Sequence, residues 1–400
     1  MTRLRLSLLL AFALPLFAAY GVDFTWDVGF ESVFDNREGS SDCSAAKTYF
    51  FTSLAPEAGV KFTETDRVAG GVVWFQPIGC EFYGQKVSPT LYYRHSGKRW
   101  RFSMGMFPRT QLVEEMPGYL WSDSLSYTQK NIRGAMLQYV HPRGFFDLYV
   151  DWRGMQTRRQ REAFNVVFHG QMSPRRNWFG FGGYVQMNHY ALQKQPPEQQ
   201  HIVDNFIVNP YLSADLGSKV HTDSLTIRAG LLATVERNRA ETDAGWRTPC
   251  GFYMEATGEW RFLGVKNTLY VGKELFPSYD YPDPTFADNK RPHATPDDLL
   301  TNPVVWSPMG PGLYQGEPYY QKKFYDRLNI YAHAYRNRYV DILASLDFNF
   351  YPGGMLFYQR LMVRVTIPCH FSSYIIPHNY EETISTDAAG HYRCSMHRAP

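Results

Sequence analysis

The sequence lacks the features of a helical membrane protein, a cofactor-binding enzyme and a metal-cluster domain. After the N-terminus, the 400-residue chain contains no run of eighteen or more apolar residues, which argues against membrane-spanning helices. It has only five cysteines, an odd number, and none has Cys-x-x-Cys spacing. A phosphate-binding loop, a dinucleotide fingerprint and a basic patch are also lacking. We therefore predict no metal site, no cofactor and no nucleic-acid partner.

The first nineteen residues have the pattern of a secretory signal peptide. Arg3 and Arg5 are followed by a continuous apolar run over Leu6–Phe17, which is too short to span a membrane as a helix. Ala18 and Ala19 supply small residues for cleavage, and no cysteine follows them as in a lipoprotein. We expect the mature chain to begin near Tyr20 and to lie beyond the inner membrane of a bacterium.

The mature sequence is dominated by segments with a period of two residues. In Gly144–Trp152 the apolar residues Phe146, Leu148 and Val150 alternate with Asp147, Tyr149 and Asp151, so one face of an extended strand is apolar and the other polar. Such segments recur about sixteen times with almost no helix between them. The candidates are Thr25–Asn36, Thr48–Phe62, Val68–Gln76, Pro89–Arg94, Arg99–Phe107, Ile132–Val140, Gly144–Trp152, Arg161–Gly170, Trp178–Tyr190, Val203–Leu216, Ser224–Glu236, Phe252–Phe262, Asn267–Glu274, Tyr325–Arg336, Val340–Phe350 and Leu356–Ile367.

The links between these segments alternate in length. Most links after odd-numbered segments are long, such as 108–131 and 275–321, whereas links after even-numbered segments are short, such as 95–98 and 337–339. Outer-membrane barrels have short periplasmic turns and long extracellular loops. The aromatic content of 16% suits the aromatic belts of such barrels, and the mean hydropathy of −0.38 fits strands whose faces alternate. The alternative is a large soluble all-β protein. We predict an all-β fold, a transmembrane antiparallel barrel over residues 20–367, followed by a periplasmic tail, 368–400.

The polar faces supply the candidate lumen and constriction residues, because charges opposed across a narrow pore select solutes. The acidic candidates are Asp147, Asp151, Glu255, Glu259, Asp341 and Asp347. The basic candidates are Arg99, Arg101, Arg153, Arg161, Arg228, Arg261, Arg327, Arg360 and Arg364. The alternative is an ion-pair network that packs and stiffens a filled lumen.

Two long links and the tail carry further candidates. The link 108–131 contains Glu114, Glu115 and Asp123, which face the basic wall if the link folds into the lumen and face solvent if it is an extracellular loop. The link 275–321 is rich in aspartate and suits a cap, a partner-binding loop or an oxygen-ligand cation site, although no EF-hand spacing is present. The tail is either a small appendage or disordered. Cys43 with Cys80, and Cys369 with Cys394, are candidate disulfides.

Inward histidines raise the question of catalysis. His169 and His333 fall on polar faces, as do Ser103 and Ser345, but the Gly-x-Ser-x-Gly nucleophile motif is missing. We therefore do not predict an enzyme, and an outer-membrane hydrolase remains a lesser alternative.

Several short segments resemble a poorly characterised Bacteroidetes-type family of outer-membrane β-barrels. They are Phe34–Glu38, Leu54–Glu57, Phe107–Arg109, Asp151–Gly154 and Arg161–Phe164. The resemblance implies a porin-like barrel in the bacterial outer membrane and carries no substrate or catalytic residues. We expect passive diffusion of small hydrophilic solutes, with outer-membrane lipid and lipopolysaccharide around the wall. The alternative is a plugged barrel that binds other envelope proteins as a structural or assembly partner.

Overall fold

The computed structural model describes residues 22–39, 46–79, 87–158, 161–174, 178–196, 202–239, 245–277, 314–371, 380–386 and 392–398. The expected signal peptide, Cys43, Cys80 and the aspartates at 280, 283, 288, 297 and 298 lie outside these residues. So do the side chains of Cys369 and Cys394. None of the helices in the described ranges is long and apolar enough to cross a membrane.

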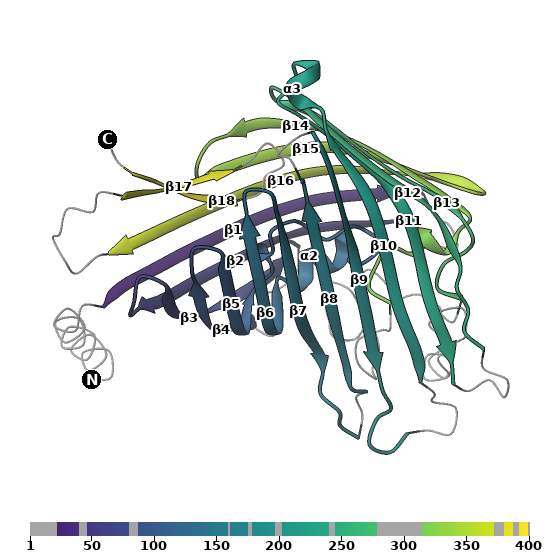
Figure 1. Cartoon of the computed structure of the whole chain (residues 1–400), viewed down its shortest axis with the longest axis horizontal. Coiled ribbons are helices and arrows are strands. Elements are labelled where there is room, and N and C mark those ends of the chain that lie inside the picture. Colours follow the sequence, from purple (N-terminus) through teal and green to yellow (C-terminus); the bar gives the residue numbers. More distant parts are fainter. Residues whose placement is uncertain are drawn as a thin grey trace.

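Within the described residues, sixteen antiparallel strands form one closed barrel (Figure 1). The first strand, β1 (Asp23–Glu38), pairs with β2 (Lys47–Lys61) on one side and with the last barrel strand, β16 (Gly354–Phe371), on the other. This seam leaves no free edge, so every strand finds its backbone partners inside the sheet, as lipid requires. The predicted all-β transmembrane barrel of about sixteen strands is confirmed.

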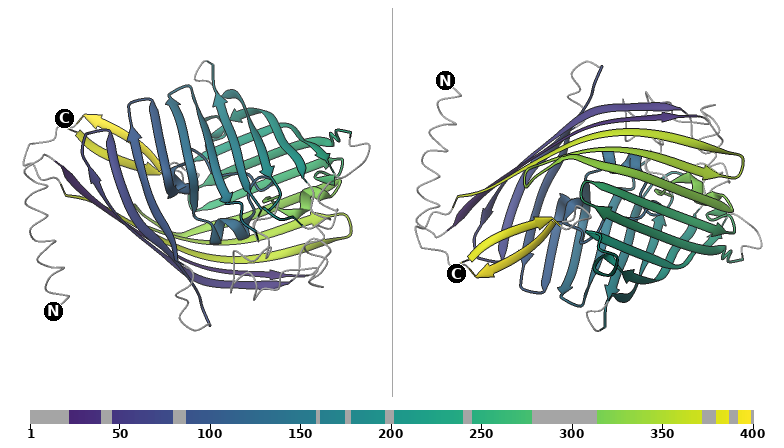
Figure 2. Two further views of the ribbon diagram at one scale, coloured as in Figure 1. Left: turned by 90° about the horizontal axis from the view of Figure 1, so that it is seen from below. Right: turned by 90° about the horizontal axis from the view of Figure 1, so that it is seen from above.

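The other barrel strands follow in chain order, each paired with its sequence neighbours. They are β3 (Asp66–Pro77), β4 (Val87–Ser96), β5 (Trp100–Pro108), β6 (Asn131–His141), β7 (Gly144–Gly154), β8 (Ala163–Met172), β9 (Phe179–Tyr190), β10 (Val203–Asp215), β11 (Ser224–Asn238), β12 (Cys250–Trp260), β13 (Leu263–Gly272), β14 (Phe324–Arg336) and β15 (Val340–Tyr351). The short helices are η1 (Arg109–Gln111), α2 (Asp123–Thr128), α3 (Gly217–Val220) and η3 (Pro318–Gln321). Figure 2 shows the closed wall from two further sides.

The two faces of the wall are inverted relative to a soluble protein. Outward side chains such as Leu91 and Leu212 are each 57% exposed, whereas the inward Asp147 is 1% exposed. Exposed apolar surface on strand after strand is stable only against hydrocarbon, and the polar face then surrounds the lumen. The protein is therefore a membrane-spanning β-barrel, the architecture of bacterial outer-membrane proteins.

Aromatic side chains mark both ends of the outward face. At the end with the longer links, Trp152 stacks on Phe164 at 5.1 Å between ring centroids, and Phe164 stacks on His189 at 4.4 Å. At the end with the short turns, Trp100 lies 5.0 Å from Tyr139. These belts are typical of the two lipid–water interfaces. We assign the end with short turns, which also holds the start of β1 and the end of β16, to the periplasm.

The end of the chain differs from the expected tail. The strand β16 continues to Phe371, four residues beyond the expected Ile367, and thus ends on an aromatic residue. Within the expected tail, β17 (Tyr380–Thr386) pairs with β18 (Tyr392–Arg398) in a separate two-stranded sheet, drawn in yellow beside the barrel in Figure 2. An appendage therefore follows the closing strand, where the residue pattern showed no alternation.

Candidate functional site

The link between β5 and β6 folds back into the lumen. It contains η1 and α2, and polar contacts join it to the wall at widely separated strands. The Arg109 guanidinium lies 2.6 Å from the Asp151 carboxylate of β7, and the backbone amide of Val113 donates to Asp147 at 3.0 Å. On the opposite wall, the Arg228 guanidinium of β11 lies 2.6 Å from the Glu114 carboxylate. We call residues 109–130 the constriction loop. The loop therefore lies inside the barrel and not in solvent, where an extracellular loop would lie.

An acid in this loop meets two arginines of the far wall. The Asp123 carboxylate accepts hydrogen bonds from Arg327 of β14 at 2.9 Å and from Arg360 of β16 at 2.6 Å. Both guanidiniums also contact Asp347 of β15, at 2.8 and 3.0 Å. Burial disfavours the charged Asp123, but Arg327 and Arg360 outweigh burial and hold the pKa of its carboxyl below its usual range. We call Asp123, Arg327, Arg360 and Asp347 the latch.

The local sequence explains why α2 begins at the latch. The Ser122 hydroxyl accepts a hydrogen bond from the backbone amide of Leu125, which is the normal role of a helix N-cap serine. Asp123 follows in the first turn, where the helix dipole favours negative charge. Further along the loop, Lys130 pairs with Glu31 of β1, and Glu31 also accepts from Arg364 at 3.0 Å.

A second segment, Tyr314–Gln321, lies against the constriction loop. The Ser122 amide donates to the Gln315 carbonyl at 2.8 Å, and the Glu317 amide donates to the Gly118 carbonyl at 2.7 Å. The Glu317 carboxylate accepts from the Asp123 amide at 2.8 Å. Burial, followed by the neighbouring Asp123 carboxylate, raises the pKa of Glu317. Backbone pairing thus joins the two segments inside the barrel.

The segments meet so closely at one position that only glycine fits. A Cβ atom on Gly316 would lie 2.3 Å from the Tyr119 carbonyl oxygen. Next to it, the buried Tyr119 side chain donates to Asn209 at 2.8 Å and packs edge-on against Tyr253 at 5.1 Å. The surrounding aromatic cluster contains Tyr184, Tyr211, Tyr270, Tyr319, Tyr320, Tyr325, Tyr351 and Tyr358. Tyrosines therefore fill much of the lumen near the two segments.

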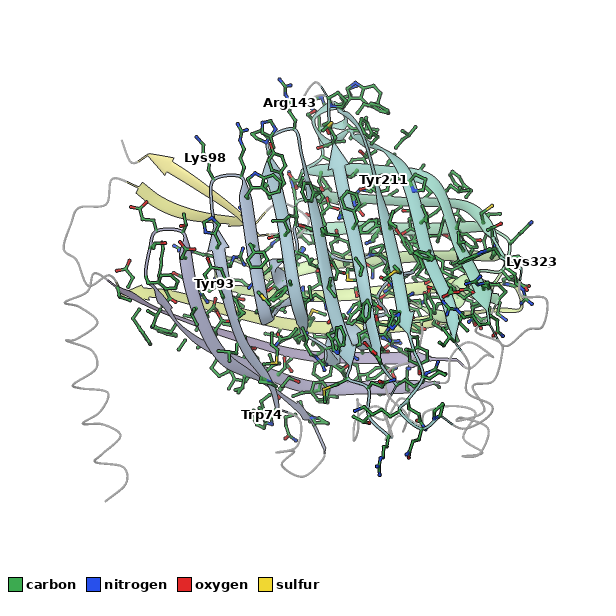
Figure 3. The ribbon with its side chains drawn as sticks, turned by 60° about the horizontal axis from the view of Figure 1, so that its bottom comes forward. Trp74, Tyr93, Lys98, Arg143, Tyr211 and Lys323 are labelled. Atoms are coloured by element: carbon green, nitrogen blue, oxygen red, sulfur yellow. The ribbon has the colours of Figure 1, made fainter. Side chains whose placement is uncertain are left out.

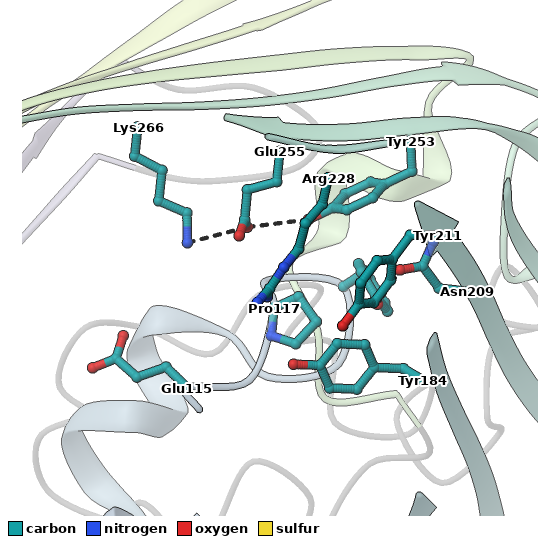
Figure 4. Close-up of a pocket in the computed structure, with 10 residues that line it drawn as sticks. Glu115, Pro117, Tyr184, Asn209, Tyr211, Arg228, Tyr253, Glu255 and Lys266 are labelled. Carbon is teal, nitrogen blue, oxygen red and sulfur yellow. Dashed lines mark hydrogen bonds and ion pairs between the residues drawn. The ribbon is translucent and has the colours of Figure 1, made fainter. Parts of the chain in front are cut away.

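A small cavity remains between the constriction loop and the wall of β9–β13 (Figure 4). Its volume of about 20 Å³ is room for roughly one water molecule. Glu115 and Pro117 of the loop face Arg228, Glu255 and Lys266 of the wall across it. The Lys266 ammonium lies 3.1 Å from the Glu255 carboxylate. Charges of both signs therefore line the narrow space, and each cation has an acidic partner.

The predicted lumen residues are spread along the barrel rather than gathered in one ring. Glu114, Asp123, Arg228, Arg327, Asp347 and Arg360 meet at or near the constriction loop, as do Asp147 and Asp151. Towards the periplasm, the Asp341 carboxylate lies 2.6 Å from His333, and Glu259 accepts from the Tyr331 hydroxyl. Arg101 is on the inward row of β5. At the other end, Arg153 donates to Asn165, and Arg161, just before β8, lies over the Tyr190 ring.

Two predicted lumen residues lie elsewhere. Arg99 precedes β5 and is exposed in the turn after β4, and Arg261 is exposed in the β12–β13 turn with a φ of 57°. The reason is that each strand is shorter at its periplasmic end than the residue pattern indicates. Conversely, sequence reasoning missed Arg109, Lys130 and Glu317, which lie outside alternating segments. Glu31 and Asp35 were also missed, although their spacing in β1 matched that of the other inward charges.

The inward histidines and serines do not form a nucleophile–base pair. His169 shares a hydrogen bond with the Tyr211 hydroxyl at 3.1 Å and stacks on Tyr184 at 3.7 Å. His333 contacts Asp341, and the Ser103 hydroxyl donates to Gln111 at 2.7 Å. Among the described residues, neither histidine forms a hydrogen bond with a serine, threonine or cysteine. Likewise, the described residues contain no group of three acidic, histidine or cysteine side chains placed to hold a metal.

Comparisons with known proteins give one family match and several solved structures. A family model described as lipid A 3′-O-deacylase-type matches residues 23–297, more than half of the chain. OprD from Pseudomonas aeruginosa is 10% identical, with a TM-score of 0.48 over 88% of this chain and 96% of that chain. OprB from Pseudomonas putida is 11% identical, with a TM-score of 0.47 over 88% and 96%. No curated protein matches the sequence.

Proposed function

The chain belongs to the lipid A 3′-O-deacylase-type family, and we propose that it works as a narrow outer-membrane channel for small hydrophilic solutes. The observation that carries this proposal is the constriction loop, whose acids meet arginines on opposite walls of the lumen. Glu114 pairs with Arg228 on β11, and Asp123 pairs with Arg327 and Arg360 on β14 and β16. A loop held across a polar lumen in this way sets the width and the charge of the path.

The charge arrangement favours small neutral or zwitterionic solutes over simple ions. At the cavity, Arg228 is neutralised by Glu114 and Lys266 by Glu255, so neither sign of charge dominates. Solute hydroxyl and amide groups can exchange hydrogen bonds with these polar side chains as they pass. Passage of a solute larger than water through this cavity of about 20 Å³ requires motion of the loop.

Liposome swelling with sugars of graded size tests this proposal. We expect slow uptake of the smallest sugars and a sharp size cut-off, together with small conductance steps in planar bilayers. A variant in which Glu114 and Asp123 are replaced by Asn or Gln residues should show faster swelling, because the loop loses its partners. A sealed lumen in both the natural protein and this variant would refute the channel.

The filled lumen also favours a second candidate, a plugged barrel that serves as an assembly partner. The supporting observation is the backbone pairing between the constriction loop and Tyr314–Gln321, which adds an internal plug to the wall. If the protein is a plugged assembly partner, it should show no conductance and should be recovered from native membranes in a stoichiometric complex with another envelope protein. Conductance by the purified barrel alone would decide against it.

The family description gives a third candidate, removal of an ester-linked acyl chain from lipid A. His333 and Asp341, 2.6 Å apart and close to Glu259, form a histidine–carboxylate pair in the lumen that such a reaction would use for proton transfer. Mass spectrometry of lipid A from cells that express the protein would show loss of one acyl chain. His333→Ala and His169→Ala variants should then abolish that loss, and an unchanged lipid A would exclude this candidate.

A further inference from the structure

Two polar side chains lie on the outward face of the wall, on the neighbouring strands β13 and β14. Asn267 shares the outward row of β13 with Val265 and Val271, which are 44% and 45% exposed. Asp326 shares the outward row of β14 with Phe324, which is 37% exposed. Apolar side chains therefore lie on both the extracellular and the periplasmic side of Asn267 and Asp326, which we call the polar pair. This position is within the band that faces hydrocarbon.

The polar pair satisfies its hydrogen-bonding groups only in part. The Asn267 amide nitrogen donates to Asp326 Oδ1 at 2.7 Å and to the Arg327 carbonyl at 3.3 Å. Within the described residues, Asp326 Oδ2 has no hydrogen-bond partner and the carboxylate has no cation. The side chains in register with Asp326 are the apolar Leu269 and Phe350. Because hydrocarbon supplies no donor, a half-exposed carboxylate at this position indicates contact with another protein surface.

The wall around the polar pair permits close approach of such a surface. Ala256 is in register with Asn267, and Ala332 is in register with Ala344 farther towards the periplasm. Small side chains at interfaces within a membrane let two backbones come close together. Lys323, which is labelled in Figure 3, is exposed at the extracellular end of β14. The same part of the wall therefore carries an acid, an amide and a cation.

We propose that this face binds a second copy of the same chain and forms a dimer within the membrane. The Asn267 nitrogen and the Asp326 carboxylate are 2.7 Å apart, so they lie at nearly the same depth. A two-fold axis along the membrane normal therefore places the amide of each copy opposite the carboxylate of the other, where an N–H group meets Oδ2. Lys323 of each copy adds a cation near the two acids. The contact is outside the barrel, so it is independent of the path through the lumen.

Energy transfer between two fluorescently labelled preparations of the full chain in lipid vesicles tests this inference. The protein-to-lipid ratio is lowered stepwise, and half-maximal transfer gives the strength of association. We expect the natural protein to dimerise, and an Asn267→Leu, Asp326→Leu variant to require a ratio about tenfold higher or more. An exchange variant, Asn267→Asp with Asp326→Asn, keeps one amide and one carboxylate at the same depth and should dimerise as the natural protein does.

A control variant, Leu91→Ala with Leu212→Ala, changes the outward face on β4 and β10, away from the polar pair, and should also dimerise normally. Natural protein that stays monomeric at every ratio would overturn the proposal, including protein that is isolated with lipid or with a different protein on this face. So would a leucine variant that associates as tightly as the natural protein, or an exchange variant that does not associate. Heat-modifiable gel mobility confirms that each variant is folded.

Discussion

The latch sets how firmly the constriction loop stays in the lumen, and an Asp123→Asn substitution tests it directly. The Asp123 carboxylate accepts hydrogen bonds from Arg327 and Arg360. The side chain of Asp123 is 23% exposed, that of Arg327 is 17% exposed and that of Arg360 is 11% exposed. An asparagine keeps the shape but loses the negative charge and one acceptor oxygen. The two arginines then keep only Asp347 as a shared acid in the latch. We therefore expect the barrel to remain folded but the loop to leave its docked position more often, and the six-residue helix α2 to open when it does.

The expected loss of docking free energy follows from the two charged hydrogen bonds of Asp123. Each such bond contributes roughly 1.5–3 kcal/mol when buried, and exposed ion pairs contribute at most about 1 kcal/mol. For a partly exposed latch in which asparagine retains one weaker acceptor, we expect a loss of about 2 kcal/mol in docking free energy. That loss corresponds to roughly a thirtyfold rise in the undocked population.

Amide hydrogen exchange across residues 118–130 measures this population. The helical amides of Ser126 and Gln129 donate to Ser122 and Leu125 at 3.0 and 2.8 Å, and they should exchange roughly thirtyfold faster in the Asp123→Asn variant. Glu115→Gln is the matched control, because Glu115 is an acid of the same loop with no ion pair or hydrogen bond among the described residues. Unchanged exchange in the Asp123→Asn variant, or equal acceleration in both variants, would refute the reasoning.

Three further predictions concern the same region. Gly316→Ala should separate Tyr314–Gln321 from the constriction loop and increase protease cleavage there, whereas Gly29→Ala, whose added Cβ would be 3.6 Å from the nearest atom, should have no effect. Arg228→Ala leaves Glu114 without its arginine partner and should shift the reversal potential towards cation selectivity, which an Arg143→Ala control should not do. Because docking raises the pKa of Glu317 above its ordinary value of 4.5, docking should strengthen as pH falls through that raised pKa, and conductance should fall with it. A Glu317→Gln variant should lose this pH response. The charged Asp123 also stabilises the docked loop, and because docking lowers its pKa, this stabilisation should persist until the pH falls below the ordinary range of an aspartate.

The barrel was accessible to sequence reasoning because a wall between lipid and water imposes the same pattern on every strand. Segments such as Ser224–Glu236 alternate strictly, and the lengths of the links indicate which end faces the periplasm. Strand ends were less accurate, since Arg99 and Arg261 continue the alternation into turns. The pattern also ends the closing strand too early, because Pro368 interrupts the alternation before Phe371.

The interior was only partly predictable from the sequence. The inward rows gave the arginines and acids of the wall, but alternation does not reveal which of them face one another across the lumen. Arg109 and Glu317 lie in links without any period, so no sequence signal placed them near Asp151 or Asp123. The pairing of 118–122 with 315–317 joins segments almost two hundred residues apart, and only the folded chain brings them together.

The seam between β1 and β16 has a consequence for how this protein is made. The residues that close the circle are the earliest and the latest of the barrel to leave the ribosome, with Phe24 facing Phe371 and Glu38 facing Phe357. A chain that ends before Gly354 lacks β16, so two strand edges keep unpaired backbone N–H and C=O groups that are not stable in hydrocarbon. Premature termination should therefore give no smaller pore, only a product that is degraded before it inserts.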